Sequence, residues 1–188
     1  MIRPAIERLS GLLTTLQADQ GLLDSYLEIK NRLIDVVRNN KTIFVIGNGG
    51  SAAQAQHFSA ELVGRYKKER RALKAIALHC DTSILTAWSN DYSFETVFSR
   101  QIEALGTPGD ALVALSTSGR SKNILSALET SKKGNLISIG ILGSDGGAAK
   151  GLCDFHLIAP SKETERIQEI HLLLLHCLAQ EIEDSLVI

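Results

Sequence analysis

Apolar residues recur at steps of three and four positions along the first forty residues of the chain. Two series follow this spacing: Ile6, Leu9, Leu13 and Leu16, and then Leu23, Tyr26, Leu27, Leu33, Ile34 and Val37. The spacing predicts one or two amphipathic helices over residues 4–39. Helices that precede the first strand can cover a sheet or pack between subunits, and we favour a subunit contact.

From residue 42 onward the pattern changes to short apolar runs, each ending in a polar or glycine-rich loop that leads into a helical stretch. The five runs are residues 42–46, 75–78, 111–115, 136–141 and 155–159, and the helical stretches are residues 51–66, 82–88, 94–105, 121–133 and 163–186. Strands that are apolar on both faces and alternate with helices are typical of a parallel sheet covered on both sides. We therefore predict a single α/β domain over residues 1–188, with an N-terminal helical segment (1–40) and a five-stranded α/β core (41–188).

Composition narrows the function classes. Hydrophobic residues make up 44% and charged residues 22% of the 188 positions, which is typical of a soluble globular protein. Lys and Arg total 20 against 21 Asp and Glu, so no net field draws the protein to nucleic acid or to an anionic membrane. Any phosphate group must therefore be bound locally.

The three cysteines, Cys80, Cys153 and Cys177, lack the CxxC spacing of a thiolate zinc site, and their odd number argues against a disulfide framework. The chain also shows no signal peptide and no apolar run of membrane-spanning length. We expect a cytoplasmic protein.

The segment Ser116-Thr117-Ser118-Gly119-Arg120-Ser121 follows a predicted strand and opens a helix. In open parallel sheets ligands bind at the carboxyl ends of the strands, near the switch in strand order. Free backbone N–H groups and the helix dipole favour an anion there, and four hydroxyl groups add donors. The plain alternative is helix capping, but capping needs one hydroxyl rather than four. We predict a phosphate site.

Two other loops are rich in glycine. Gly47-Asn48-Gly49-Gly50-Ser51 joins the first strand to its helix, and its glycines allow a ligand to approach the backbone. It matches neither GxGxxG nor a nucleotide-binding loop with Lys, which argues against a nucleotide. The loop over residues 143–147 is predicted to be a tight turn without a ligand.

His57, Glu61 and Arg65 stand at four-residue steps after the first strand, so they share one helix face. A His and a Glu in this arrangement can share a metal ion or act as an acid–base pair. The alternative is a solvated face with a Glu61–Arg65 ion pair.

The last helix carries Gln168, His171 and His176 beside a run of four leucines. A histidine on such a helix is more often a packing residue than a ligand. Gln168 and His176 are about 12 Å apart along the helix axis, so they meet at one ion only if both lean inward or if two subunits contribute. Asn90 and Asp91 fall in a predicted loop, where they can form a turn or bind sugar hydroxyls.

Together these residues resemble the phosphoheptose isomerase branch of the SIS (sugar isomerase) family over essentially the whole chain. Four segments carry the resemblance: G-N-G-G-S-A-A-Q-A-Q-H-F-S-A-E-L at 47–62, S-N-D at 89–91, S-T-S-G-R-S at 116–121, and R-I-Q-E-I-H at 166–171 with the later His176. The resemblance implies a flavodoxin-like three-layer fold and a homotetramer with active sites between subunits. It also implies isomerisation of sedoheptulose 7-phosphate to D-glycero-D-manno-heptose 7-phosphate for lipopolysaccharide synthesis.

The resemblance assigns roles to individual residues. It implies one Zn²⁺ per subunit, held by His57, Glu61, Gln168 and His176, and it makes Glu61 and His176 the acid–base pair. The implied phosphate contacts are Ser116, Thr117, Ser118 and Ser121. The other implied substrate contacts are Asn48, Gly49, Gly50, Glu61, Asn90, Asp91 and Gln168. Arg65 matches an active-site neighbour, and Glu165 stands where some members carry Asp.

Two other functions share this fold. One branch of the family binds the bacterial replication initiator and is not catalytic; it keeps the glycine loop but lacks Glu and His at the positions of Glu61 and His176. Sugar-phosphate sensing domains are normally fused to a DNA-binding segment, and this sequence has no basic helix-turn-helix region. Glu61 and His176 therefore favour the enzyme.

Overall fold

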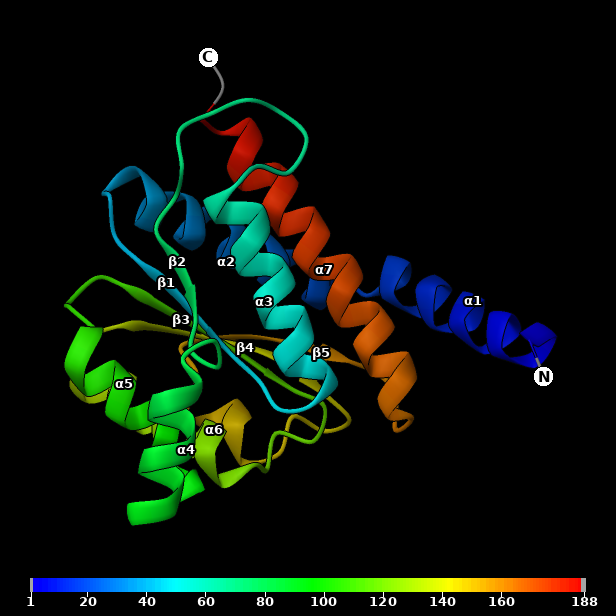
Figure 1. Ribbon diagram of the computed structural model, residues 1–188. Coiled ribbons are helices and arrows are strands. Elements are labelled where there is room, and N and C mark those ends of the chain that lie inside the picture. The colour runs from blue at the N-terminus through cyan, green and yellow to red at the C-terminus, as the bar shows by residue number, and fades with distance from the viewer. Residues whose placement is uncertain (1, 187–188) are drawn as a thin grey trace.

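A five-stranded parallel sheet forms the centre of the protein (Figure 1). The computed structural model describes residues 2–186. The strands are β1 (Ile43–Ile46), β2 (Ala75–Ala77), β3 (Ala111–Ser116), β4 (Ile137–Gly143) and β5 (Phe155–Ala159). Their spatial order is β2-β1-β3-β4-β5. The predicted strands and fold class are confirmed, and this order is that of flavodoxin-like proteins.

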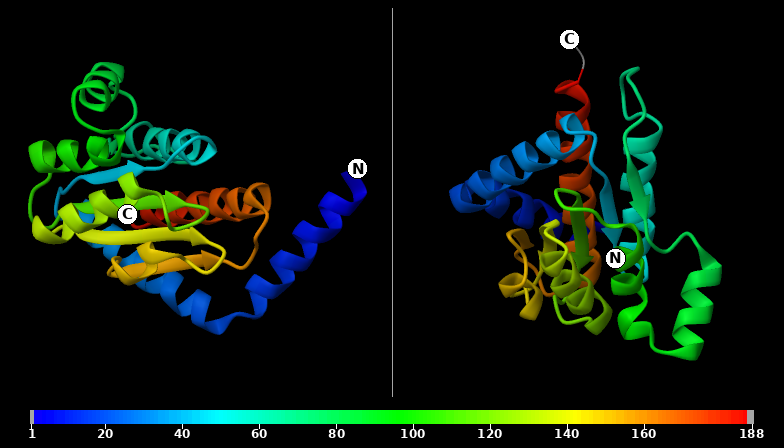
Figure 2. Two further views of the ribbon diagram at one scale, coloured as in Figure 1. Left: turned by 90° about the horizontal axis from the view of Figure 1, so that it is seen from below. Right: turned by 90° about the vertical axis from the view of Figure 1, so that its left-hand side faces the viewer.

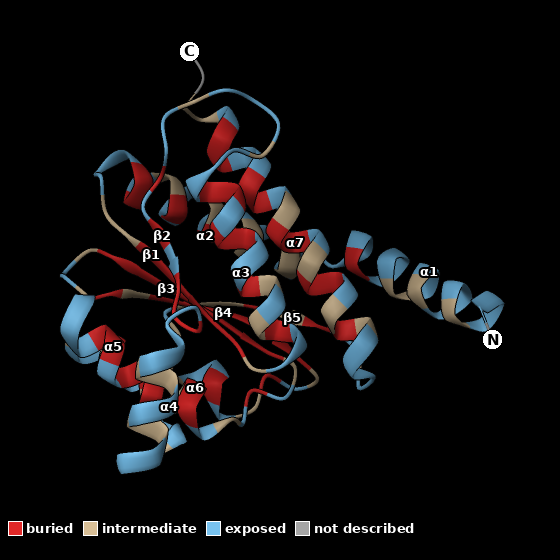
Figure 3. Cartoon of the chain, in the orientation of Figure 1, coloured by how far each residue is buried: buried red, intermediate tan, exposed pale blue. Residues whose placement is uncertain are grey.

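Helices cover both faces of the sheet because the strand residues alternate between two buried cores. Ile43 and Val45 belong to one core and Phe44 and Ile46 to the other, and strands that are apolar on both faces require cover on both. The first core is closed by α2 (Gln20–Arg38), α3 (Gly50–Val63) and α7 (Thr164–Asp184). The second is closed by α5 (Val97–Leu105) and α6 (Lys122–Lys133), with α4 (Thr82–Asp91) outside them. Figure 3 shows the strands buried between these layers.

The N-terminal segment forms two helices with different surroundings. Asp19 separates α1 (Ile2–Ala18) from α2 and caps α2 by accepting a hydrogen bond from the backbone N–H of Leu22. The apolar face of α2 packs on the sheet of its own chain, and a subunit contact of this N-terminal segment stays a prediction. Helix α1 instead extends away from the body of the molecule and leaves Ile2 and Ile6 exposed (Figure 2).

The strand order reverses between β1 and β3, which lie next to each other at the centre of the sheet. The glycine loop (residues 47–51) follows β1, and the serine loop (residues 116–121) follows β3. Both loops therefore lie at the switch point where open α/β sheets bind ligands. No helix within residues 2–186 has the length and apolarity needed to span a membrane.

Candidate active site

Helices α3 and α7 run side by side in the same direction (Figure 1). Their side chains bring two histidines and a glutamate together. The Nε2 atom of His57 lies 3.0 Å from Nε2 of His176 and 3.1 Å from Oε1 of Glu61. The Nε2 atom of His176 lies 3.5 Å from the same Glu61 oxygen. Glu61 and His57 are brought together by their helical spacing, whereas His176 reaches them only because α7 packs against α3.

The three facing atoms suit a metal ion. All three lie within 4.8 Å of one another. Two ligands placed about 2.0–2.1 Å from a tetrahedral Zn²⁺ are roughly 3.3 Å apart, which agrees with the separations in this cluster. Two imidazoles and one carboxylate are also a donor set that zinc sites use. The residues present therefore fit the implied metal.

Glu61 is buried, and its two carboxylate oxygens have different surroundings. Oε1 faces the two imidazoles, whereas Oε2 is buried without a hydrogen-bond partner among the described residues. Burial raises the pKa of the Glu61 carboxyl, and the neighbouring His57 and His176 lower it without cancelling the rise. Oε2 is therefore free to accept a proton.

Gln168 lies at the glycine loop rather than beside the three facing groups. A Cβ atom added to Gly50 would lie 2.6 Å from Nε2 of the Gln168 side chain, so its amide packs directly on the glycine backbone. Gly50 and His57 are about 10 Å apart along α3. Within one chain the cluster thus consists of His57, Glu61 and His176, and the role of Gln168 as a fourth ligand stays a prediction.

The serine loop is shaped by its own hydroxyl groups. The Ser116 hydroxyl accepts a hydrogen bond from the Gly119 N–H at 3.0 Å, and the Ser118 hydroxyl accepts one from the Arg120 N–H at 3.2 Å. Ser121 is the N-cap residue that precedes α6, but its side chain makes no capping hydrogen bond, so its hydroxyl remains available at the helix N-terminus. This arrangement favours an anion at the start of α6.

A pair of asparagine side chains joins the glycine loop to the first turn of α6, directly after the serine loop. The amide of Asn48 donates to Oδ1 of Asn123 at 2.9 Å, and the amide of Asn123 donates back at 2.8 Å. Oδ1 of Asn123 also accepts the N–H of Ile124 in the first turn of α6. Sequence reasoning missed Asn123, because its only signal is a partner 75 positions earlier in the chain.

The third loop, residues 143–147, packs against the serine loop. A Cβ atom on Gly147 would lie 2.6 Å from the carbonyl oxygen of Ser118, and Asp145 binds Arg120 through two hydrogen bonds of 2.9 and 2.6 Å. The Arg120 guanidinium and the Gly147 N–H hold the pKa of Asp145 down at about 2. This loop was predicted to be a tight turn without a ligand. Its observed contacts are with Ser118 and Arg120, so it packs against the serine loop and helps to hold it in place.

Some expectations for individual residues need correction. Asn90 and Asp91 are the last residues of α4 rather than part of a loop, and their side chains hydrogen-bond to each other. Helix α3 ends at Val63, so Arg65 lies beyond it and pairs with Glu69 at 3.2 Å instead of with Glu61.

Two further predictions concern the start of α7 and the substrate contacts. Glu165 is exposed in the first turn of α7. The exposed pair Asn90–Asp91 lies on a helix that buries none of its residues, so its contact with a substrate stays a prediction.

Two buried histidines are packing residues. His171 hydrogen-bonds to the carbonyl oxygen of Leu142 at 2.9 Å, and burial lowers its pKa to about 4. A buried, hydrogen-bonded histidine is what we expect of a packing residue. His79 accepts the N–H of Gly47 at 3.1 Å and so fixes the start of the glycine loop; burial lowers its pKa as well. Sequence reasoning missed His79.

Comparison with known proteins gives a consistent picture. A family model described as the SIS domain matches residues 10–143. A phosphoheptose isomerase from Nitratiruptor sp. is 55% identical over 152 residues, 81% of each chain, and phosphoheptose isomerase 1 from Campylobacter jejuni is 50% identical over 169 residues, 90% of this chain and 91% of its own. A solved phosphoheptose isomerase from Francisella tularensis superposes with a TM-score of 0.93 at 33% identity, covering 97% of this chain and 96% of its own.

Proposed function

Because the chain belongs to the SIS domain family and to its phosphoheptose isomerases, we propose that it converts sedoheptulose 7-phosphate to D-glycero-D-manno-heptose 7-phosphate. The proposal rests mainly on the closeness of Glu61 and His176. Oε1 of Glu61 lies 3.5 Å from Nε2 of His176, although the two residues come from different helices. The chain is thus a sugar-phosphate isomerase, and it keeps an acid–base pair suited to that chemistry.

The reaction moves one proton from C1 of the ketose to C2 through an enediol. We assign removal and return of this proton to Oε2 of Glu61, because Oε1 faces the two imidazoles whereas Oε2 has no hydrogen-bond partner among the described residues. His176 exchanges the second proton, giving it to the C2 oxygen and taking one from the C1 oxygen, which requires that its Nε2 atom is not bound to the metal during this step. The net change is one C–H bond broken and one formed, so no oxidant or reductant is needed.

The substrate is anchored by its phosphate at the serine loop in this proposal. Ser116, Thr117, Ser118 and Ser121 line the start of α6, where backbone N–H groups favour an anion. Asn48 links the glycine loop to the first turn of α6 through Asn123, and the Gln168 amide contacts the backbone of Gly50. A seven-carbon sugar carries its phosphate and carbonyl at opposite ends, which suits a phosphate site separated from the acid–base pair.

We further propose one Zn²⁺ per subunit, held by His57, Glu61 and His176, with Gln168 as the fourth ligand. The bound ion would stabilise negative charge on the sugar oxygens as the enediol forms. The separations of 3.0–3.5 Å among the three facing atoms and the suitability of the donor set support this assignment.

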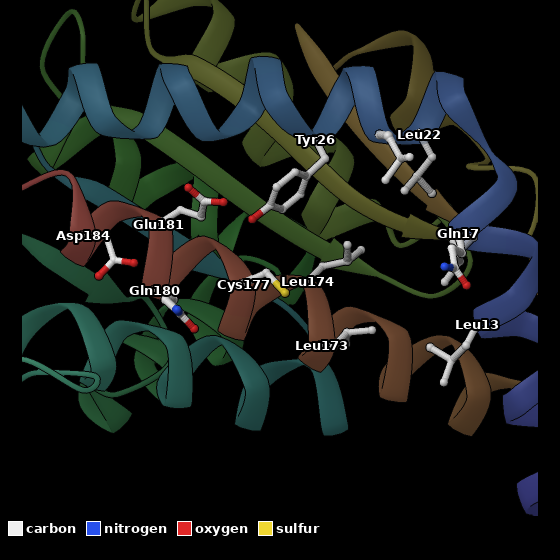
Figure 4. A pocket seen from close by; sticks show the side chains of 12 residues that line it. Leu13, Gln17, Leu22, Tyr26, Leu173, Leu174, Cys177, Gln180, Glu181 and Asp184 are labelled. Atoms are coloured by element: carbon white, nitrogen blue, oxygen red, sulfur yellow. The ribbon is translucent and has the colours of Figure 1, made fainter.

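A homotetramer with active sites between subunits is also proposed. Support comes from a groove of about 560 Å³ between α1, α2 and α7, where apolar side chains lie open to solvent (Figure 4). Its lining includes Leu13, Leu23, Tyr26, Leu173 and Cys177. A groove of this kind on helices beside the cluster suits a second copy of the chain.

In the cell we propose a cytoplasmic role in supplying heptose for lipopolysaccharide, without a nucleic-acid or membrane partner. The near balance of 20 basic and 21 acidic residues supports the absence of such partners. The alternative, binding of a replication initiator, finds no support in the relatives described above.

Incubation of the purified protein with sedoheptulose 7-phosphate tests the function, with the product followed by NMR. We expect conversion in the presence of Zn²⁺, loss of conversion after treatment with a chelator, and recovery when Zn²⁺ is returned. An absence of conversion by zinc-loaded, folded protein would contradict the proposed activity. Full conversion after complete metal removal would contradict the metal's role alone.

A further inference from the structure

The imidazole of His176 stacks on the ring of Tyr66. Their centroids are 5.9 Å apart and their planes differ by 18°. The Nε2 atom of His176 faces His57 and Glu61, and within residues 2–186 no protein group hydrogen-bonds to its Nδ1 atom. A metal-binding histidine is usually oriented by a hydrogen bond to its second nitrogen. The His57 ring meets this imidazole edge-on at 5.2 Å, so the stacked ring of Tyr66 is the aromatic contact that lies along its face.

Tyr66 is itself held by a buried carboxylate on the helix that carries His176. Glu183 accepts hydrogen bonds from the backbone N–H groups of Tyr66, Lys67 and Lys68 at 2.8, 2.7 and 2.6 Å. Glu183 lies about two turns after His176 on α7, so both residues face the same side. These three hydrogen bonds fix the segment after α3 against α7.

Arg70 completes the anchor from the other side. Its Nε lies 3.6 Å from Oε2 of Glu183, and both side chains are only 2% exposed. The terminal nitrogens of Arg70 donate to the backbone carbonyls of Glu61 at 2.6 Å and Gly64 at 2.8 Å. The Glu183–Arg70 pair therefore joins the end of α3, where Glu61 lies, to the segment that carries Tyr66.

We propose that Tyr66 is a positioning residue that orients His176 for proton transfer and metal binding, and that the Glu183–Arg70 pair holds Tyr66 in place. The inference rests on the proposed function, since it concerns the same histidine. The flat ring is the feature that matters, because within residues 2–186 the Tyr66 hydroxyl makes no hydrogen bond.

Three variants at one position test the proposal: Tyr66→Leu removes the flat ring, Tyr66→Met does so with a flexible side chain, and Tyr66→Phe keeps it. For Leu and Met we expect kcat to fall about 10-fold and the Kd for Co²⁺ to rise about 10-fold, the lower end of the range for groups that orient metal ligands. KM should change less than about two-fold, because the phosphate is held at the serine loop. The visible spectrum of bound Co²⁺ should shift, and Tyr66→Phe should restore every value.

Tyr66 is half-buried, so circular dichroism should find at least one of the Leu and Met variants folded. Wild-type kcat and an unchanged Co²⁺ spectrum in a folded Leu or Met variant would overturn the proposal. So would a Phe variant as impaired as the Leu variant, since the hydroxyl would then be responsible. If wild-type protein fails to isomerise the sugar, the proposed function fails, and Co²⁺ affinity and spectrum still decide the role of Tyr66.

Discussion

Gly50 illustrates how one residue limits the site. It is the first residue of α3, and the Gln168 amide lies where a Cβ atom would be. Glycine is therefore needed at this position for close approach rather than for an unusual backbone angle. The contact also joins the start of α3 to the start of α7, the two helices that carry the proposed acid–base pair.

The variant Gly50→Ala should keep its fold and lose activity. The added methyl group displaces the flexible end of Gln168, so we expect the free energy of unfolding to change by less than about 1 kcal/mol. Misplacement of a substrate contact should lower kcat/KM on the order of 10²-fold. Steady-state kinetics and thermal unfolding check both expectations.

Gly11→Ala is the matched control, because it lies in α1 and a Cβ atom there would meet nothing within 4 Å. It should retain wild-type kinetics. If Gly50→Ala retains them too, Gln168 has no role at its observed position.

At this scale the sequence predicts only what local spacing determines. His57 and Glu61 are paired correctly because a helix places four-residue neighbours on one face. Asn123 and His79 escape prediction, because each acts through a partner brought close by the sheet, Asn48 and Gly47 respectively. The spacing also suggests an ion pair between Glu61 and Arg65. This pair does not form, because α3 ends before Arg65 at the C-cap residue Gly64.

Among the elements, the contact between the end of α3 and α7 has its own pH dependence. Burial alone would raise the pKa of Glu183, but three backbone N–H donors and Arg70 lower it below the ordinary value of 4.5. A carboxyl whose pKa is lowered by folding stabilises the protein at pH above its unfolded value. This contribution is lost as the pH falls through the folded value.

Replacement of Glu183 by Gln should therefore destabilise the protein at neutral pH and matter less in acid. Breaking a buried pair leaves Arg70 without a counter-charge, which costs about 3–5 kcal/mol. Urea unfolding at a series of pH values should show the difference between wild type and variant shrinking below pH 4.5.

Glu181→Gln is the control on the same helix, since Glu181 is exposed and its ion pair with Lys30 spans 4.0 Å. It should change stability by less than about 1 kcal/mol. A wild-type to Glu183→Gln difference that stays constant down to pH 2 would contradict the role of this carboxylate.

Element types could be predicted from the sequence, whereas some element ends could not. The five strands follow from their apolar runs, and their order agrees with the expected fold. Helix α4 continues through Asn90 and Asp91, although both residues commonly form turns. Trp88 hydrogen-bonds to Thr96, a contact with the following segment that residue preferences do not include.

On the scale of the whole molecule, α1 is the element that its own chain explains least. Ile2 is 77% and Leu13 38% exposed, and Leu13 lines the groove beside α7. The apolar periodicity of α1 could be read from the sequence, but the surface that covers it could not, because the sequence does not specify how copies are arranged.

The substitution Leu13→Glu should weaken the assembly without unfolding the chain. A charge in the groove would be buried by a second copy but remains in water on the isolated chain. Light scattering after size-exclusion chromatography should show a tetramer for wild type and a smaller species for the variant. The neighbouring exposed Thr14→Glu should remain a tetramer. An unchanged mass for Leu13→Glu would place the interface elsewhere.

In the proposed mechanism Glu61 moves the proton between the two sugar carbons, and the variant Glu61→Gln removes this base. The variant keeps the side-chain shape, so circular dichroism should match that of wild type. Loss of the base should slow NMR-monitored conversion of sedoheptulose 7-phosphate by about 10²–10⁴-fold at equal zinc content. Conversion at the wild-type rate by the folded, zinc-loaded variant would show that Glu61 is not the base.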